Sequence, residues 1–180
     1  MLRTVGNALR AAAAVWGLTV SASQAQPIDR WHYITRESVL FADRVAGLHG
    51  AGVIQADEIF AMLYLGLPEE NGVVSIVLPT PDPAERLTSV LVSPSGQRFE
   101  RNLSAQELDT APVGSGRQAY SFPITDEDVD LFKSATAWEL RIGDTVWSIS
   151  LDGSRRAIEL AEAERARQLS ELTRELVPTD

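Results

Sequence analysis

A β-hairpin is predicted by the segment Trp138-Glu-Leu-Arg-Ile-Gly-Asp-Thr-Val-Trp-Ser-Ile-Ser-Leu151. Apolar and polar side chains alternate on its first arm, which is the period of a half-buried β-strand. Gly143-Asp144 suits a two-residue type II′ turn, because glycine tolerates the first loop position of that turn. The turn pairs Ile142 with Thr145, so the polar side chains occupy one face of the hairpin. The opposite face then carries Trp138, Leu140, Ile142, Trp147 and Ile149.

The segments before this hairpin predict further strands. Leu87–Val92 and Gln97–Leu103 flank Ser93-Pro-Ser-Gly96, whose proline and glycine stand at the positions preferred in a type I turn. Val73–Leu78 is rich in β-branched residues and is followed by three prolines that prevent its continuation. Ile59–Leu67 is apolar throughout, and so short a run leaves a buried strand and a buried helix both open.

Two helices are predicted in the second half of the chain. Thr125-Asp-Glu-Asp128 has the pattern of a capping box and predicts a short helix near 125–134. Asp152 or Ser154 can cap a longer helix that runs to about Leu176. Its apolar stripe comprises Ile158, Ala161, Leu169, Leu172 and Leu176, with an interruption at Arg165. Such a helix would be about 34 Å long, so we expect its second half to project.

These elements predict a mainly β protein of the α+β class. We expect an antiparallel β-sandwich or a curled sheet, with the short helix near 125–134 and the longer helix at the C-terminus. The 180 residues are enough for one domain, for which we expect residues 26–165, while residues 166–180 form the projecting helix and tail. Ala111–Gln118 is predicted to be a flexible loop.

Composition excludes several classes of function. The chain has no cysteine, so disulfides, thiol catalysis and Cys-based zinc sites within it are excluded. Its formal net charge of −9 argues against nucleic acid as a partner, because that binding depends on basic side chains.

The N-terminus predicts a cleaved signal peptide over residues 1–25. Residues 1–10 are basic, with Arg3 and Arg10 and no acidic residue, and residues 11–20 are uncharged and mostly apolar. Ser23 and Ala25 are small enough for the cleavage site. Ten apolar residues fall short of the roughly 20 that span a bilayer, and no later segment reaches about 18 uninterrupted apolar residues. We therefore expect a bacterial protein that is periplasmic or secreted, with no transmembrane span after cleavage.

Few residues suggest a site. His32 and His49 match no metal-binding spacing, and they are the pocket candidates if the protein binds a small molecule or glycan. The glycines of Gly47–Gly52 predict a turn or bulge rather than a phosphate or oxyanion loop, since the Walker lysine is missing. Asp126–Asp130 is an acidic cluster that leaves calcium binding open, although capping explains the acids and the EF-hand pattern is absent.

The segment Ser150-Leu-Asp-Gly-Ser-Arg-Arg-Ala-Ile158 resembles the closing part of invasion-associated locus B-type periplasmic proteins. The matching positions are Ser150, Leu151, Gly153, Ala157 and Ile158. The resemblance covers about the last third of the domain, and the family's usual cysteines are absent here. It implies a non-enzymatic, β-rich envelope protein without catalytic residues.

Taken together, the sequence predicts an exported, non-catalytic envelope interaction or accessory protein without a cofactor or metal. Its expected contact surface includes Leu169, Leu172 and Leu176 on the projecting helix, which would bind an envelope protein or a second copy of the chain. The alternative is a periplasmic small-molecule or glycan-binding module, with or without hydrolase activity.

Overall fold

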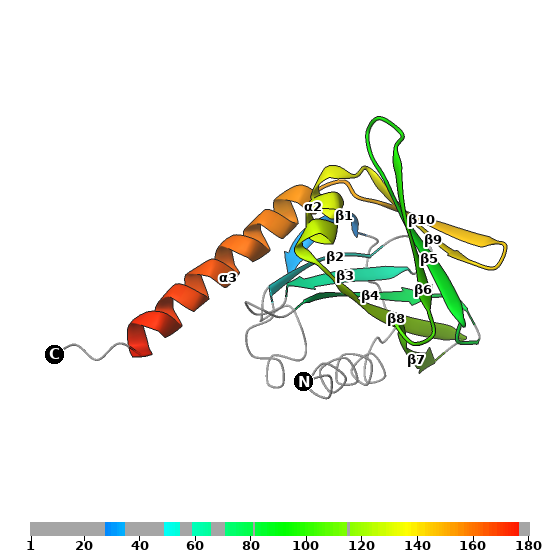
Figure 1. The fold of residues 1–180 in the computed structure, drawn as a ribbon, viewed down its shortest axis with the longest axis horizontal. Coiled ribbons are helices and arrows are strands. Elements are labelled where there is room, and N and C mark those ends of the chain that lie inside the picture. The colour runs from blue at the N-terminus through cyan, green and yellow to red at the C-terminus, as the bar shows by residue number, and fades with distance from the viewer. Residues whose placement is uncertain are drawn as a thin grey trace.

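The computed structural model describes residues 28–34, 49–54, 59–65, 71–80, 82–114 and 116–176, so the predicted signal peptide lies outside the described residues. Ten strands and two helices follow one another in these ranges (Figure 1). The strands are β1 (Ile28–Ile34), β2 (His49–Ile54), β3 (Phe60–Leu65), β4 (Gly72–Leu78), β5 (Arg86–Val92), β6 (Arg98–Ser104), β7 (Asp109–Gly114), β8 (Arg117–Ile124), β9 (Ala137–Ile142) and β10 (Thr145–Ser150). The helices are α2 (Asp126–Ser134) and α3 (Ser154–Leu176).

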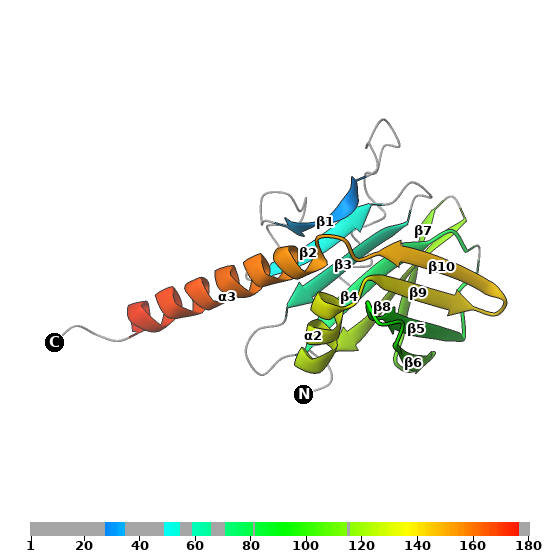
Figure 2. The ribbon, with the colours of Figure 1, turned by 90° about the horizontal axis from the view of Figure 1, so that it is seen from above.

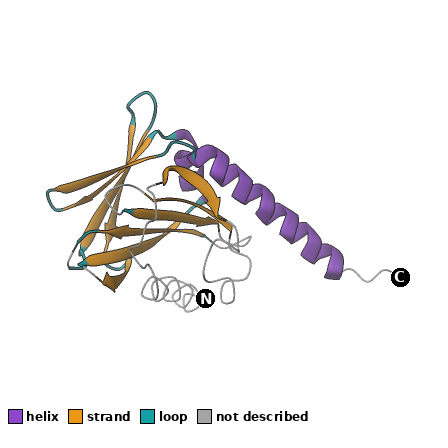
Figure 3. Ribbon diagram, turned by 180° about the vertical axis from the view of Figure 1, so that it is seen from behind, coloured by secondary structure: helices purple, strands orange, loops and turns teal. Residues whose placement is uncertain are grey.

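The strands form two antiparallel sheets, which confirms the predicted mainly β, α+β fold. The six-stranded sheet has the order β1-β2-β3-β4-β8-β7, and the four-stranded sheet has the order β10-β9-β5-β6. One core cluster joins both sheets and both helices, with Leu63 and Phe122 from the first sheet, Leu87 and Trp138 from the second, and Phe132 from α2. The strands make up the body of the molecule and the helices lie at one end (Figure 3).

The hairpin of β9 and β10 has the predicted register. Ile142 pairs with Thr145, Leu140 with Trp147, and Trp138 with Ile149. Trp138, Leu140 and Ile149 are fully buried, and Ile142 and Trp147 pack against the core from partly buried positions. Gly143 has a φ of +56°, which explains why a glycine begins the turn.

The other predicted strands are confirmed as well. β5 pairs with β6 across the Ser93–Gly96 turn, in which the Gly96 amide donates to the Ser93 carbonyl at 2.9 Å. β4 occupies the Val73–Leu78 run, and the ambiguous Ile59–Leu67 run contains strand β3 rather than a helix. Its alternating burial shows that one face of β3 packs on the core.

α2 begins as the capping pattern predicts. The Thr125 hydroxyl accepts from the Asp128 amide at 3.2 Å, and the Asp128 carboxylate accepts from the Thr125 amide at 2.9 Å. These two bonds satisfy amides that the first helical turn leaves without an internal partner. Val129 and Phe132 then carry the buried face of the helix into the core.

α3 packs across β1 and β2 and touches α2. The start of the helix is held by β1, because the Trp31 amide donates to the Asp152 carbonyl at 3.0 Å and the Trp31 indole donates to the Ser150 carbonyl at 2.9 Å. Neither helix of the described chain has both the length and the apolar composition for crossing a membrane.

Two expectations about loops are wrong. Ala111–Gln118 is not a flexible loop but the centre of the β7–β8 hairpin, whose turn is made by Gly114 and Gly116 at φ +83° and +71°. Pro112 is tolerated there because β7 is an edge strand, where a missing N–H costs no ladder hydrogen bond.

Within Gly47–Gly52, the described residues 49–52 form part of strand β2 rather than a turn or bulge. Its glycines permit close packing instead. A Cβ at Gly50 would lie 2.6 Å from the Leu63 carbonyl oxygen, and a Cβ at Gly52 would lie 2.6 Å from the Ile34 side chain.

Candidate functional site

The second half of α3 is the most prominent feature outside the core. Among the α3 side chains whose burial the structure describes, up to residue 171, the buried ones lie in the first turns, where Ala157, Ile158 and Ala161 join the core cluster. From residue 162 to residue 171 every side chain is half-buried or exposed. Figures 1 and 2 show the helix continuing well beyond the edges of both sheets.

The predicted contact residues lie on this part of the helix. Leu169 is half-buried, and positions 172 and 176 follow it at the spacing of one helical face. Arg167 forms ion pairs with Glu164 and Glu171, three and four residues away. Pairs at these spacings support a helix that leaves its sheet, because they stabilise it without tertiary contacts.

The two candidate histidines do not converge on one site. They lie on the neighbouring strands β1 and β2, but their side chains have opposite surroundings. His32 is exposed, whereas His49 is only 4 % exposed. The side chain of His49 lies on the face that also carries Tyr33, whose hydroxyl is 3.1 Å from His49 Nδ1. A pocket built on both histidines is therefore not formed.

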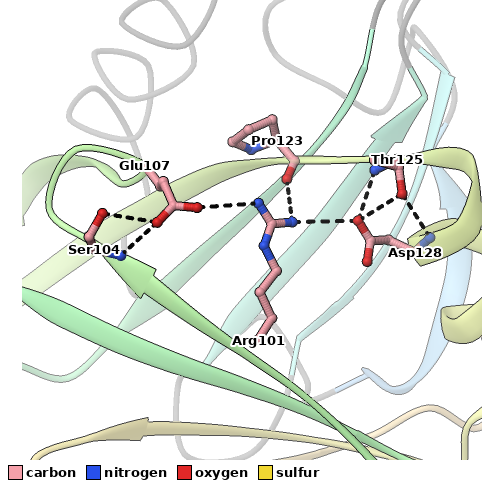
Figure 4. A network of polar contacts seen from close by, with 6 residues as sticks. All are labelled: Arg101, Ser104, Glu107, Pro123, Thr125 and Asp128. Carbon is pink, nitrogen blue, oxygen red and sulfur yellow. Dashed lines mark hydrogen bonds and ion pairs between the residues drawn. The ribbon is translucent and has the colours of Figure 1, made fainter.

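A network around Arg101 links the two sheets to the start of α2 (Figure 4). Arg101 Nη1 donates to the Pro123 carbonyl at 2.9 Å and lies 3.4 Å from the Asp128 carboxylate that caps α2. Arg101 Nη2 lies 3.9 Å from Glu107, and the guanidinium sits 5.9 Å from the centre of the Phe122 ring. Arg101 comes from β6 and Pro123 from β8, so the side chain bridges the four-stranded and six-stranded sheets.

The partners of Arg101 are themselves held in place. Glu107 accepts from the amide and the hydroxyl of Ser104 at 3.0 and 2.9 Å. These two bonds, in that order, together with the nearby Arg101 charge, hold the pKa of Glu107 below its ordinary value. The guanidinium of Arg101 thus contacts Glu107 on one side and Pro123 and Asp128 on the other. This arrangement favours a structural role for Arg101 over ligand binding.

Replacing Arg101 with methionine is expected to lower the free energy of unfolding by about 2 kcal/mol, because a hydrogen bond to a charged group is lost between half-buried partners. Arg98→Met is the matched control on the same strand, since Arg98 pairs with Glu139 on the outer surface. Its expected cost is below about 1 kcal/mol. Urea denaturation of both variants measures the difference, and equal losses would show that Arg101 is an ordinary surface cation.

Two pockets lie near the helices. One of about 90 Å³ lies beside Arg101, and its lining includes Phe99, Phe122 and Leu131. The other, of about 310 Å³, lies where α2 ends and α3 begins. Its cations are engaged, since Lys133 pairs with Asp130 and Glu162, and the Arg155 side chain donates to the Lys133 carbonyl. Neither pocket brings a histidine together with a carboxylate.

Two members of the acidic cluster Asp126–Asp130 have partners within the protein. Asp128 caps α2, and Asp130 lies 2.7 Å from Lys133 Nζ. Among the residues that the structure describes, no group of three or more histidine, aspartate or glutamate side chains is arranged to hold a metal ion.

Tyr33 and Arg101 were not among the candidates from the sequence. The sequence does contain a signal for Arg101. It lies two residues from both Phe99 and Leu103, and residues two apart on a strand share a face, so Arg101 lies on the same face as these apolar side chains. An arginine on an apolar face predicts a buried charge partner. Tyr33 has no such signal, since its contact with His49 depends on how β1 and β2 pair.

Comparisons of the chain with protein-family models, with curated proteins and with solved structures find no match.

Proposed function

We propose that the protein is an exported, non-catalytic bacterial envelope protein, periplasmic or secreted, that acts by binding another protein through the second half of α3. The observation that carries this proposal is the long extension of α3 beyond the sheets (Figure 2). Maintaining a helix outside the core costs conformational entropy, and binding to a partner helix or groove would offset that cost.

The export part of the proposal rests on the sequence of residues 1–25. The resemblance of Ser150–Ile158 to invasion-associated locus B-type periplasmic proteins supports the same compartment and a role without catalysis. The alternative, a small-molecule or glycan-binding module, has no specific observation in its favour, because His32 and His49 do not share a site and neither of the two pockets described above is lined by a histidine.

Deleting residues 166–180 is expected to abolish capture of the partner while leaving the sandwich folded, because Ala161 is the last buried residue of α3 in the range that the structure describes, up to residue 171. The measurement is in-cell cross-linking of the exported protein in its native host, followed by mass spectrometry, together with the oligomeric state of the purified chain. Leu160→Ala is the matched control, since Leu160 is 48 % exposed on the docked part of the same helix. Unchanged cross-links and an unchanged oligomeric state after the deletion would contradict the proposal.

A further inference from the structure

The six-stranded sheet has a second buried surface, on the face that is turned away from the core. On β3, burial alternates and places Ala61 and Leu63 in the core cluster, so Phe60 and Met62 point to the opposite face. Val77 on β4 pairs with Phe60 and therefore lies on that face too. Val77 is only 1 % exposed, yet it does not belong to the core cluster. We call this surface the outer face of the six-stranded sheet.

The outer face continues from β4 onto β8 with small side chains. Ser75 pairs with Met62 on one side and with Ser121 on the other, and Ala119 pairs with Val77. Ser75, Ala119 and Ser121 are each only 2 % exposed. The two serine hydroxyls are 2.7 Å apart and hydrogen-bond to each other, so they satisfy their own polarity. The centre of the outer face is therefore mostly apolar and is shielded from water.

The other described elements pack on the core side of this sheet. The four-stranded sheet contributes Leu87 and Trp138 to the core cluster, α2 contributes Phe132, and α3 contributes Ile158. Among the helices and strands that the structure describes, none is left to cover the outer face. Small side chains at the centre of a sheet are accessible to water unless another layer lies over them. The burial of Val77 and its neighbours thus points to a further segment on this face.

The sequence before β1 has the composition to cover an apolar face. Residues 11–20 carry no charged side chain and are mostly apolar. Residues 1–25 contain two arginines and no acidic residue, whereas the whole chain has a formal net charge of −9. On β7, at the far edge of the same face, the acidic residue Asp109 pairs with Ser121. The charge of the N-terminal segment is therefore opposite to that of the surface it would approach.

The N-terminal segment is long enough to reach the centre of the outer face. β1 begins at Ile28, and the row of paired residues that contains Ile28 runs across β2 and β3 to Val77 on β4. Neighbouring strands are about 4.8 Å apart, so β4 lies about 14 Å from β1. Residues 21–27 can span up to about 23 Å. Residues 11–20 would add about 15 Å even in a helix, and so can lie over both β4 and β8.

We propose that residues 11–20 dock on the outer face of the six-stranded sheet while residues 1–25 are attached, and that removal of residues 1–25 uncovers this face. Docking removes apolar surface of both the segment and the sheet from water. The uncovering step rests on the proposed export and cleavage, whereas the docking does not. After cleavage the protein presents a second apolar surface besides the second half of α3, and exposed surfaces of this kind mark interaction sites.

Thiol labelling of a single cysteine tests the docking. The chain has no cysteine, so Ser75→Cys introduces one thiol on the outer face. Its reaction with a maleimide is timed in the purified full-length chain and in a chain that starts at residue 26, which retains every described residue. We expect the reaction to be at least about tenfold slower in the full-length chain, because a covered thiol reacts only when the cover opens. Ala119→Cys is the second reporter if the Ser75→Cys variant does not fold.

Further variants separate docking from folding. Ala61→Cys places the thiol in the core, where Ala61 is 0 % exposed, and should stay unreactive in both chains. In the full-length chain, Leu18→Asp puts a charge into the docking stretch and should speed the reaction at Ser75→Cys. Ser21→Asp is the matched control, because it lies outside that stretch and should leave the rate unchanged.

Four results would overturn the docking. The Ser75→Cys thiol could react at the same rate in both chains, whether protected or accessible, which would show that residues 1–25 are not the cover. Leu18→Asp could leave the rate unchanged, or Ser21→Asp could raise it equally. The Ala61→Cys thiol could become reactive together with the Ser75→Cys thiol, which would report unfolding. None of these measurements involves partner capture by α3, so failure of the docking and failure of the proposed function are distinguishable.

Discussion

Trp138→Ala is expected to lower the free energy of unfolding by about 3–5 kcal/mol, which is the usual cost of removing a fully buried aromatic side chain. Trp138 is 0 % exposed and lies where the two sheets and α2 meet. Its ring packs edge-on against Phe132 at 5.1 Å and against Phe122 at 6.5 Å. Its indole N–H donates to the Ser89 hydroxyl at 2.8 Å. Alanine would leave a cavity and remove the hydrogen-bond donor of Ser89.

Urea denaturation followed by far-ultraviolet circular dichroism measures this loss. Trp147→Ala is the matched control, because Trp147 stands on the partner strand of the same hairpin but is only half-buried. Its expected cost is about 1–2 kcal/mol. If both variants lost the same stability, the centre of the core would not lie at Trp138.

Gly50→Val is expected to lower the free energy of unfolding by about 3 kcal/mol, the upper end of the cost of forcing atoms into a packed site. A Cβ at this position would lie 2.6 Å from the Leu63 carbonyl oxygen and 3.2 Å from the Tyr64 ring. Because the nearer atom belongs to the backbone of the neighbouring strand, no side-chain rotation relieves the overlap. β2 and β3 would have to separate at a central position of the six-stranded sheet.

Gly116→Ala distinguishes this steric effect from a general cost of losing glycine. Gly116 has a φ of +71° and no atom within 4 Å of its added Cβ. Its expected cost of about 1 kcal/mol comes only from the left-handed backbone conformation. Thermal unfolding of both variants provides the comparison, and a cost for Gly50→Val no greater than that for Gly116→Ala would contradict the close-packing explanation.

Local patterns in the sequence predicted much of the fold. The Gly143-Asp144 turn and the alternation around it determine the β9–β10 register, since a slip of one residue would bury Glu139 and Arg141 in place of Leu140. Thr125 and Asp128 are three residues apart, so their reciprocal cap forms within one helical turn. Both features depend on neighbours in the chain.

The wrong expectations concern segments whose structure depends on distant partners. Ala111–Gln118 lacks a strand pattern, yet it forms the β7–β8 hairpin because β8 is buried beside β4. In the sequence alone, Gly50 and Gly52 suggest a turn. In the fold they lie in β2, where the close approach of β3 requires residues without a side chain. Short-range preferences are weak in such segments, and pairing with an already buried strand overrides them.

The sequence by itself determined strands β4, β5, β6, β9 and β10, the register of the β9–β10 hairpin, the N-terminal cap of α2 and the length of α3. Only the tertiary structure decided that Arg101 reaches Asp128, that Trp31 holds the start of α3, and that His49 is buried while His32 is exposed. The first set arises from contacts within a few residues, whose geometry follows from the periods of helix and strand. The second set joins residues as far apart as Trp31 and Asp152, and no local period records which of them the packed core brings together.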